Sequence, residues 1–441
     1  MPRLLLAQQV LLALSLLCVG AVQTEAADMQ NWIVSWTGAA QGPYPVGNPT
    51  AQPELKFVFP NPESGATDQT FRLIVRPDIW GREARFRLSN AFGTKPVTFS
   101  AVRLGLQTSG AALLAESNRM VSFNGKNSVT VPPGGSVMTD TVALTFVKDP
   151  ADPMLMGRKL AISFHVVGSS GPMTWHAKAL QTSYLSQPGA MHTDDETEAA
   201  YPYSTTSWFF LDAVTMAAAA RTTAVVAFGD SITDGTASTI SGDDRWPDVF
   251  SRRMHAVYGN KFAVVNQGIG GNQVAGPAEY TPARPINGGP SALSRLDRDI
   301  VSLPGVGAVV WLEGINDFGT SGATVDTVMQ GYRDGVAYLR KHLPRVKVYV
   351  ATLTTALAST PTHGTTEVDA KRKALNAWFK TENIFDGVAD FDAATLDATT
   401  GGLKPEFKPG SSIGGPGDGL HPNRAGYAAM GAAVDLGWFK K

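Results

Sequence analysis

A serine, an aspartate and a histidine in this sequence have the types and spacing that acyl-transfer chemistry requires. Ser231 lies in Gly-Asp-Ser-Ile-Thr-Asp-Gly (229–235), and Asp418 and His421 lie in Asp-Gly-Leu-His-Pro (418–422). A serine hydroxyl becomes an effective nucleophile when a histidine takes its proton and a carboxylate holds the imidazole. Taken alone, each segment has a simpler interpretation, because Asp230 and Ser231 are common turn caps and His421 is placed to begin the last helix.

Two further loops contain hydrogen-bond donors for a developing oxyanion. The first, Asn-Gln-Gly-Ile-Gly-Gly-Asn (266–272), has glycines that let backbone N–H groups approach a ligand closely. The second, Glu-Gly-Ile-Asn-Asp (313–317), contains Asn316, whose amide is a neutral donor. Each such donor typically contributes about 3 kcal/mol of transition-state stabilisation in acyl transfer.

Other polar residues support competing assignments of the chemistry. His363 follows a strand through a loop and is the second candidate for the base. His176, in Trp-His-Ala (175–177), would reach the site from the N-terminal half, but packing as an aromatic–histidine pair is the favoured explanation for it. A cluster of Asp230, Asp234 and Asp317 would instead suit metal-dependent phosphoester hydrolysis, which a chelator would stop.

Carbohydrate binding or adhesion through the N-terminal half is the alternative from another class of function. Exposed aromatic side chains would support it, although isolated aromatic residues usually pack into cores. The residues considered are Trp32, Trp36, Trp80, Tyr201 and Tyr203.

The C-terminal half has the pattern of alternating strands and helices that would position these loops. Unbroken apolar runs typical of buried parallel strands occur at 224–228, 262–266, 307–312, 346–353 and 387–391. Segments of helical period follow at 244–258, 292–303, 325–343, 367–381 and 425–439. This alternation predicts an α/β layer structure, in which ligands bind beyond the carboxyl ends of the strands. Ser231 and the two donor loops follow directly after the first three strands, as that rule requires, and His421 is placed at the start of the last helix.

The N-terminal half, from about 32 to 215, has a β pattern. Short, partly alternating apolar runs occur at 71–75, 83–89, 98–104, 128–131, 142–147 and 160–167. Their spacing is typical of a β-sandwich. The runs 83–89 and 98–104, joined by turn residues, predict a hairpin.

The first residues predict an export signal. Arg3 precedes a mostly apolar run at 4–22, and Thr24 and Ala26 are small enough for cleavage after Ala26, with Ala27 as the alternative. Cys18, the single cysteine of the 441 residues, lies inside this run, so the exported chain is expected to have no thiol for a disulfide or a Cys-based zinc site. We expect no stable membrane span after cleavage.

The overall composition is that of a globular protein, and its net charge creates no overall electrostatic field that would attract polyanions. Charged residues make up 17% and hydrophobic residues 43% of the chain, and the formal net charge is −1. Nucleic acid is therefore not an expected partner. The proposed chemistry requires neither a metal nor an organic cofactor, and the sequence does not indicate an oligomeric state.

The joint pattern from about Thr223 to the C-terminus resembles the SGNH hydrolases, also called GDSL esterases and lipases. The resemblance implies that Ser231 is the nucleophile and that Asp418 and His421 complete its triad. It also implies an oxyanion hole formed by the backbone N–H groups of Ser231 and Gly271 and the side chain of Asn316. Because two glycines are adjacent, residue 270 is an alternative for the second donor.

The resemblance implies a three-layer, flavodoxin-like α/β domain with a parallel sheet, preceded by a β-sandwich-like domain. We expect a signal peptide at 1–26, a β-rich domain at 27–220 and the catalytic domain at 221–441. Residues 87–93 and 175–177 resemble the leading region of a secreted subgroup. The expected function is that of an exported serine ester hydrolase of the carboxylesterase, acetylesterase or lipase type. Its substrate is expected to be a small-molecule or glycan-linked ester, and polysaccharide de-O-acetylation is one specific alternative.

Overall fold

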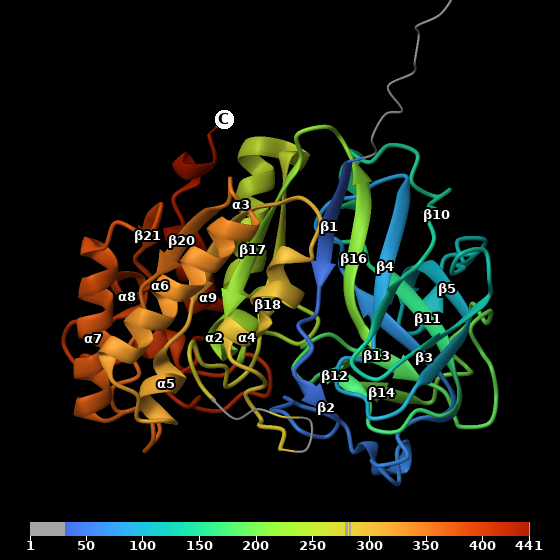
Figure 1. Cartoon of the computed structure of the whole chain (residues 1–441), viewed down its shortest axis with the longest axis horizontal. Helices are drawn as coiled ribbons and strands as arrows, with labels where there is room; N and C mark the ends of the chain where they lie inside the picture. Colours follow the sequence, from blue (N-terminus) through green and yellow to red (C-terminus); the bar gives the residue numbers. More distant parts are fainter. Residues whose placement is uncertain (1–30, 278–280, 282–283, 441) are drawn as a thin grey trace, which may run out of the picture.

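The computed structural model describes residues 31–277, 281 and 284–440. The predicted signal peptide at 1–26, with Cys18, lies outside these residues. Antiparallel sheets are formed by the chain up to Ala218, and a parallel sheet begins at Thr223. Figure 1 shows these two parts side by side.

The N-terminal part contains two antiparallel sheets that share one core, as the sequence predicted. The five-stranded sheet consists of β1 (Asn31–Thr37), β16 (Leu211–Ala218), β4 (Glu83–Ser89), β10 (Val142–Ala143) and β9 (Ser136–Met138). The eight-stranded sheet consists of β14 (Tyr203–Thr205), β13 (Ser183–Leu185), β3 (Thr67–Val75), β11 (Leu160–Ser169), β5 (Val97–Ser109), β6 (Ala112–Leu113), β7 (Arg119–Met120) and β8 (Ser128–Val131). A small third sheet consists of β15 (Trp208–Phe209), β12 (Thr174–His176) and β2 (Gly42–Pro43).

The predicted hairpin between 83–89 and 98–104 is wrong, because β4 and β5 belong to different sheets. β4 pairs with β16, β9 and β10, whereas β5 pairs with β11 and β8. Phe86 of β4 and Phe99 of β5 are both fully buried in the same hydrophobic cluster. The connection between the strands therefore crosses from one sheet to the other, so that both strands turn their apolar sides to a common core.

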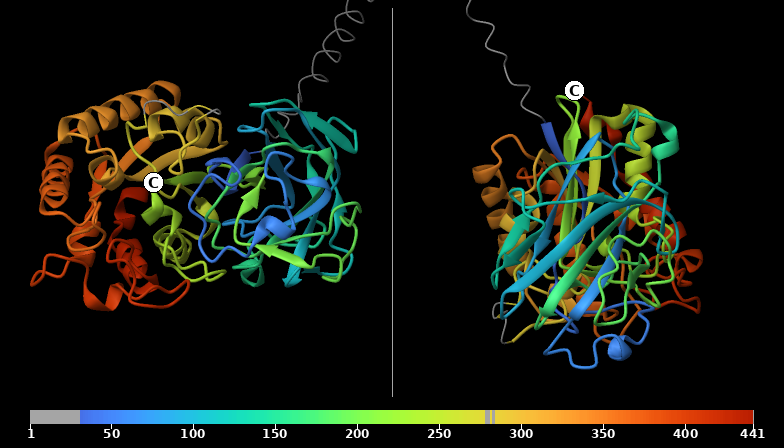
Figure 2. Two further views of the ribbon diagram at one scale, coloured as in Figure 1. Left: turned by 90° about the horizontal axis from the view of Figure 1, so that it is seen from below. Right: turned by 90° about the vertical axis from the view of Figure 1, so that its right-hand side faces the viewer.

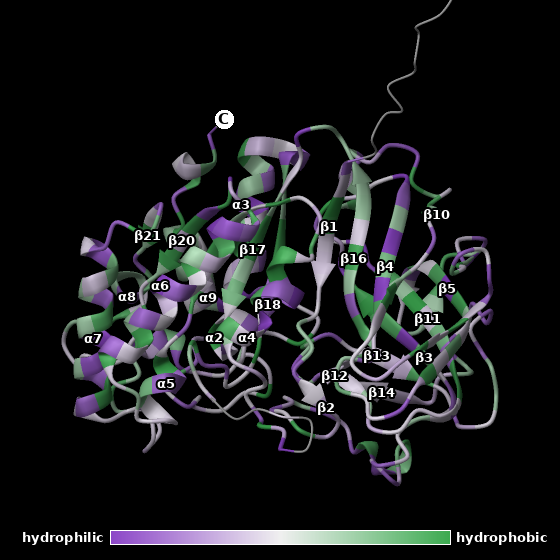
Figure 3. Cartoon of the chain, viewed as in Figure 1, coloured by the Kyte–Doolittle hydropathy of each residue, from purple (hydrophilic) through white to green (hydrophobic). Residues whose placement is uncertain are grey.

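The C-terminal part has the predicted α/β architecture. Its five parallel strands lie in the order β18 (Phe262–Gly268), β17 (Thr223–Gly229), β19 (Val306–Leu312), β20 (Lys347–Ala351) and β21 (Gly387–Ala389). In chain order this is 2-1-3-4-5, the flavodoxin-like arrangement. The strands are strongly apolar (Figure 3) and form the centre of the second hydrophobic core.

Helices cover the parallel sheet in two groups (Figures 1 and 2). One group consists of α3 (Trp246–Tyr258), α8 (Phe391–Thr395) and α9 (Arg424–Ala433), which contact one another. The other consists of α4 (Ala292–Leu296), α6 (Val325–His342), α7 (Thr366–Thr381) and the short α5 (Ile315–Gly319). Within the described ranges, no helix has the length and apolarity needed to cross a bilayer.

Two predicted helices end earlier than their sequence period indicated. The segment predicted at 292–303 is α4 followed by a π-helical turn, Asp297–Val301. The last helix ends at Ala433, because Val434 has an extended backbone, and a 3-10 turn follows at Leu436–Phe439. Other 3-10 turns are Leu55–Phe57, Pro153–Leu155, Gly259–Lys261 and Pro405–Phe407.

The N-terminal part covers the free edge of β18. Among the strands of the described residues, β18 pairs only with β17, and β1 packs along it from the five-stranded sheet. The Val264 backbone N–H donates to Asp78 Oδ2 at 2.6 Å, and Thr37 Oγ1 donates to the Asn266 carbonyl at 2.7 Å. Because buried backbone groups need hydrogen-bond partners, these side chains replace the missing neighbouring strand.

Candidate active site

The structure brings Ser231, His421 and Asp418 together at the carboxyl edge of the parallel sheet. His421 Nε2 lies 2.7 Å from Ser231 Oγ, and His421 Nδ1 lies 2.5 Å from Asp418 Oδ2. The serine and the histidine come from segments 190 residues apart. Both distances are within hydrogen-bond range, so the imidazole connects the carboxylate to the hydroxyl.

Asp418 is held as a charged acceptor by its own turn. Its Oδ1 accepts hydrogen bonds from the backbone N–H groups of Leu420 and His421, at 2.9 and 2.8 Å. Burial opposes the negative charge, but the hydrogen bond and charge of His421, together with these two N–H groups, keep the pKa of Asp418 well below its ordinary value. His421 precedes the helix rather than beginning it, because Asn423 caps α9.

Ser231 lies on a sharp turn from β17 into α2 (Ser231–Asp234). Asp230 caps this short helix by accepting the Ile232 N–H at 2.9 Å. A side chain at Gly229 is excluded, because a Cβ there would lie 2.0 Å from the Leu312 carbonyl oxygen. The turn leaves the Ser231 N–H at the first position of the helix, with no acceptor among the described residues.

The loop after β18 presents its two adjacent glycines differently. The Gly270 N–H donates to Asp234 Oδ2 at 3.1 Å. The Gly271 N–H has no acceptor within the part of the chain that the structure describes, and Gly271 has a φ of 83°, a conformation that favours glycine. Of the two glycines, Gly271 therefore has the amide that remains available to a ligand.

Asn316 lies on α5, beside this loop, with only 5% of its surface exposed. Its Nδ2 donates to the Asn272 carbonyl at 2.9 Å, and its Oδ1 lies 3.1 Å from His363 Nε2. One hydrogen of the amide nitrogen is therefore used within the protein and the other remains. α5 is held against the loop because Asp317 accepts the backbone N–H groups of Val274 and Ala275.

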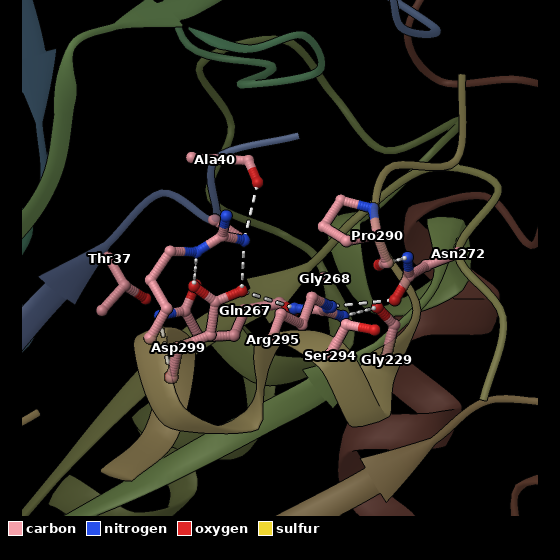
Figure 4. Close-up of polar contacts among 12 residues, drawn as sticks. Thr37, Ala40, Gly229, Gln267, Gly268, Asn272, Pro290, Ser294, Arg295 and Asp299 are labelled. Atoms are coloured by element: carbon pink, nitrogen blue, oxygen red, sulfur yellow. Dashed lines mark hydrogen bonds and ion pairs between the residues drawn. The ribbon is translucent and has the colours of Figure 1, made fainter. Parts of the chain in front are cut away.

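A buried arginine that the sequence analysis did not identify connects these turns (Figure 4). Arg295 of α4 donates to the Gly229 carbonyl at 2.9 Å and to the Gln267 carbonyl at 2.8 Å. It also donates to Asn272 Oδ1 at 2.8 Å and pairs with Asp299 at 3.0 Å. One guanidinium thus connects the chain just before Ser231 to the loop that contains Gly271, using the planar fork that only arginine has. No motif signals this role, because it arises from contacts between distant elements.

The N-terminal part also contacts the catalytic loops. His176 Nε2 lies 3.1 Å from Asp234 Oδ1, on the carboxylate whose other oxygen accepts the Gly270 N–H. Burial opposes a positive charge on His176, but the charge and hydrogen bond of Asp234 raise its pKa above the ordinary value. Lys178 donates to Thr236 Oγ1 at 2.6 Å, next to the same loop. The β-rich part therefore helps to hold the second donor loop.

The structure gives the alternative assignments little support. Asp230, Asp234 and Asp317 each accept hydrogen bonds from protein groups, and among the described residues no three His, Cys, Asp or Glu side chains could hold a metal ion.

Of the aromatic residues proposed for carbohydrate binding, Trp36, Trp80 and Tyr201 are buried, while Trp32 and Tyr203 are partly buried. These residues therefore do not form the exposed aromatic surface that carbohydrate binding would require.

Three buried acids below the site have raised pKa values. Burial is the largest cause in each case, and it raises the pKa of Asp230 to about 7, of Glu313 to about 8 and of Asp317 to about 6. Glu313 Oε2 accepts the Trp311 indole N–H at 2.8 Å, whereas its Oε1 has no partner within the described chain. These acids therefore keep their protons to a higher pH in the folded protein than in the unfolded chain.

We expect the free energy of unfolding to fall as the pH rises from about 5.5 to about 8.5. The raised pKa values mean that the folded state binds protons more tightly than the unfolded state, so this contribution is complete below about pH 4 and is lost as the pH passes through about 6 to 8. Glu313→Gln cannot ionise and still accepts from Trp311, so it should flatten the dependence. Urea unfolding followed by tryptophan fluorescence at both pH values would check this, and an unchanged slope in the variant would contradict the assignment to Glu313.

Comparisons with known proteins place this chain beside one family and several solved structures. Residues 227–429 match the family described as the GDSL-like lipase/acylhydrolase family. Among solved structures, a carbohydrate acetylesterase family member from Sinorhizobium meliloti is 19% identical and has a TM-score of 0.36, covering 48% of this chain and 94% of its own. A GDSL-like lipase from Bacteroides thetaiotaomicron is 19% identical with a TM-score of 0.36, covering 50% of this chain and 90% of its own. No curated protein matches the sequence.

Proposed function

Because residues 227–429 belong to the GDSL-like lipase/acylhydrolase family, we propose that this protein is a serine ester hydrolase with Ser231 as its nucleophile. The observation that carries the proposal is the position of His421, whose two ring nitrogens contact Ser231 Oγ and the Asp418 carboxylate. A base held between a hydroxyl and an orienting carboxylate is the arrangement that acyl transfer uses.

In the proposed mechanism, His421 Nε2 takes the Ser231 proton while Oγ attacks the carbonyl carbon of the ester. The tetrahedral intermediate expels the alcohol, which takes the proton from His421, and an acyl-enzyme remains. His421 then takes a proton from water as the water oxygen attacks the acyl carbon. The bond between that carbon and Ser231 Oγ breaks, His421 returns the proton to Oγ, and the acid is released. Asp418 holds the imidazole with its proton on Nδ1 and stabilises the imidazolium that forms in each half of the reaction.

We propose that the oxyanion is bound by the Ser231 and Gly271 N–H groups and by the free hydrogen of Asn316 Nδ2. The proposal of Gly271 rather than Gly270 is supported by the hydrogen bond that occupies the Gly270 amide. These donors are held by protein contacts before substrate arrives, so they need little reorganisation when charge develops.

The proposed setting is outside the cytoplasm, supported by the signal-like sequence at 1–26. The proposed substrates are carboxylic esters of small alcohols or of sugars, and removal of acetyl groups from a polysaccharide is the specific case that we favour testing. No feature of the proposed mechanism calls for a metal or an organic cofactor.

The proposed function can be tested by covalent labelling. A fluorophosphonate should react with the purified protein, abolish hydrolysis of p-nitrophenyl acetate, and add its mass to the peptide that contains Ser231, because phosphonylation requires an activated serine. Treatment with EDTA beforehand should leave both the labelling and the hydrolysis unchanged. Labelling of another residue, or loss of hydrolysis under EDTA, would contradict the proposal.

A further inference from the structure

A second histidine lies beside the proposed oxyanion hole. His363 is in the loop between β20 and α7, and its Nε2 lies 3.1 Å from Asn316 Oδ1. Because His363 Nε2 contacts Asn316 instead of Ser231, its position does not support the role of base.

The amide of Asn316 has to be held in one orientation to act as a donor. Its Nδ2 faces the Asn272 carbonyl at 2.9 Å, an acceptor that would repel the amide oxygen if the side chain were flipped. Its Oδ1, on the other side, then needs a donor, and the imidazole N–H of His363 is that donor. The two contacts together fix the plane of the amide, and with it the direction of the second Nδ2 hydrogen.

The surroundings of His363 select the tautomer that this contact requires. Thr360 Oγ1 lies 3.1 Å from His363 Nδ1 and also accepts the His363 backbone N–H at 3.2 Å. The threonine hydroxyl can therefore donate to Nδ1, which leaves the proton of a neutral ring on Nε2. Burial lowers the pKa of His363, and the charge of His421 lowers it further, so the neutral ring is favoured.

The helix that carries Asn316 leaves room for the ring. At Gly319, the last residue of α5, a Cβ would lie 2.4 Å from His363 Cδ2 and 2.9 Å from Nε2. Any side chain at this position would push the imidazole away from Asn316. The close approach of α5 and the loop therefore depends on glycine at residue 319.

We propose that His363 is a positioning residue for ester hydrolysis, which orients the Asn316 amide so that its free N–H faces the oxyanion. The inference rests on the proposed function, because it assigns Asn316 the role of oxyanion donor. His363 acts only through Asn316 and does not touch the reacting atoms.

A double-mutant cycle on the full-length protein tests this inference. Asn316→Ala should lower kcat by about 10²- to 10³-fold, the usual effect of removing one oxyanion donor. His363→Met removes the N–H but keeps a side chain of comparable length, and should lower kcat by about tenfold or more with little change in KM, because it disturbs the same donor. In the Asn316→Ala background, His363→Met should have almost no further effect. Equal effects of His363→Met in both backgrounds would overturn the proposal, as would a rise in KM with kcat unchanged.

His363→Gln is the matched control, because the glutamine amide can place a donor near the position of Nε2. It should recover most of the activity that His363→Met loses, and failure to exceed His363→Met would count against a donor role. An independent measurement is the ¹⁵N spectrum of the Asn316 side-chain NH₂ group. Slow exchange of its hydrogens with solvent should be kept in His363→Gln and lost in His363→Met. Loss of hydrolysis in Ser231→Ala tests the proposed function separately, and the NMR readout does not depend on turnover.

Discussion

Replacement of Ser231 by alanine is expected to reduce kcat for p-nitrophenyl acetate by about 10⁵-fold or more, to a level set by the remaining oxyanion donors. The physical reason is that Ser231 Oγ lies 2.7 Å from His421 Nε2, where its proton can be taken. Without it, no acyl-enzyme can form. The measurement is steady-state hydrolysis by the purified variant, with circular dichroism and thermal unfolding to confirm that the fold is retained.

The control for this prediction is the pair of variants His421→Ala and Ser231→Ala/His421→Ala. Residues that act as a unit are strongly non-additive, so the double variant should be no slower than either single variant within about threefold. Hydrolysis by Ser231→Ala above about 1% of the wild-type rate would exclude Ser231 as the nucleophile.

Asp418→Asn is expected to lower kcat by about 10⁴-fold at neutral pH, while the protein folds normally. Asparagine can still accept the backbone N–H groups of Leu420 and His421 through its oxygen. Its NH₂ group would then face His421 Nδ1, which favours the tautomer with the proton on Nε2. That proton would point at Ser231 Oγ, so the ring could no longer accept the serine proton.

Asp418→Ala separates the two contributions of this carboxylate. Alanine has no NH₂ group to favour the tautomer with the proton on Nε2, but it also cannot accept the backbone N–H groups of Leu420 and His421. Asp418→Ala should therefore lose activity together with some thermal stability, whereas Asp418→Asn should lose activity alone. If Asp418→Asn retained more than about a tenth of the wild-type kcat, the carboxylate would not be orienting the base.

The sequence predicted the elements whose signals are local. The parallel strands have long apolar runs with turn residues after them, and β4 was predicted with its observed bounds, Glu83–Ser89. The pairing of β4 with β16 could not be predicted in the same way, because the partners lie more than 120 residues apart and neither contains a signal for the other. The hairpin prediction failed for this reason: short connections favour hairpins, but a shared core outweighed that preference.

The residues of the candidate site also differ in whether the sequence alone could predict them. Ser231, Asp418 and His421 could be predicted because their chemistry requires particular residue types in short motifs. Arg295 could not, since a helical arginine is ordinarily a surface residue, and its value here depends on three carbonyl and carboxamide oxygens from other elements. The choice between Gly270 and Gly271 likewise depends on a single hydrogen bond to Asp234.

The contacts of the β-rich part with the second donor loop bear on how this enzyme could be engineered or could diverge. Gln41 Nε2 lies 3.3 Å from the Gly270 carbonyl oxygen, although the two residues are 229 positions apart, and His176 reaches the same loop through Asp234. A chimera that joined this C-terminal half to another protein's leading half would inherit the catalytic motifs without these supports. Changes in either half are therefore constrained by the other. The two halves should be redesigned together, and we expect them to evolve together, because the C-terminal half alone would lack these supporting contacts.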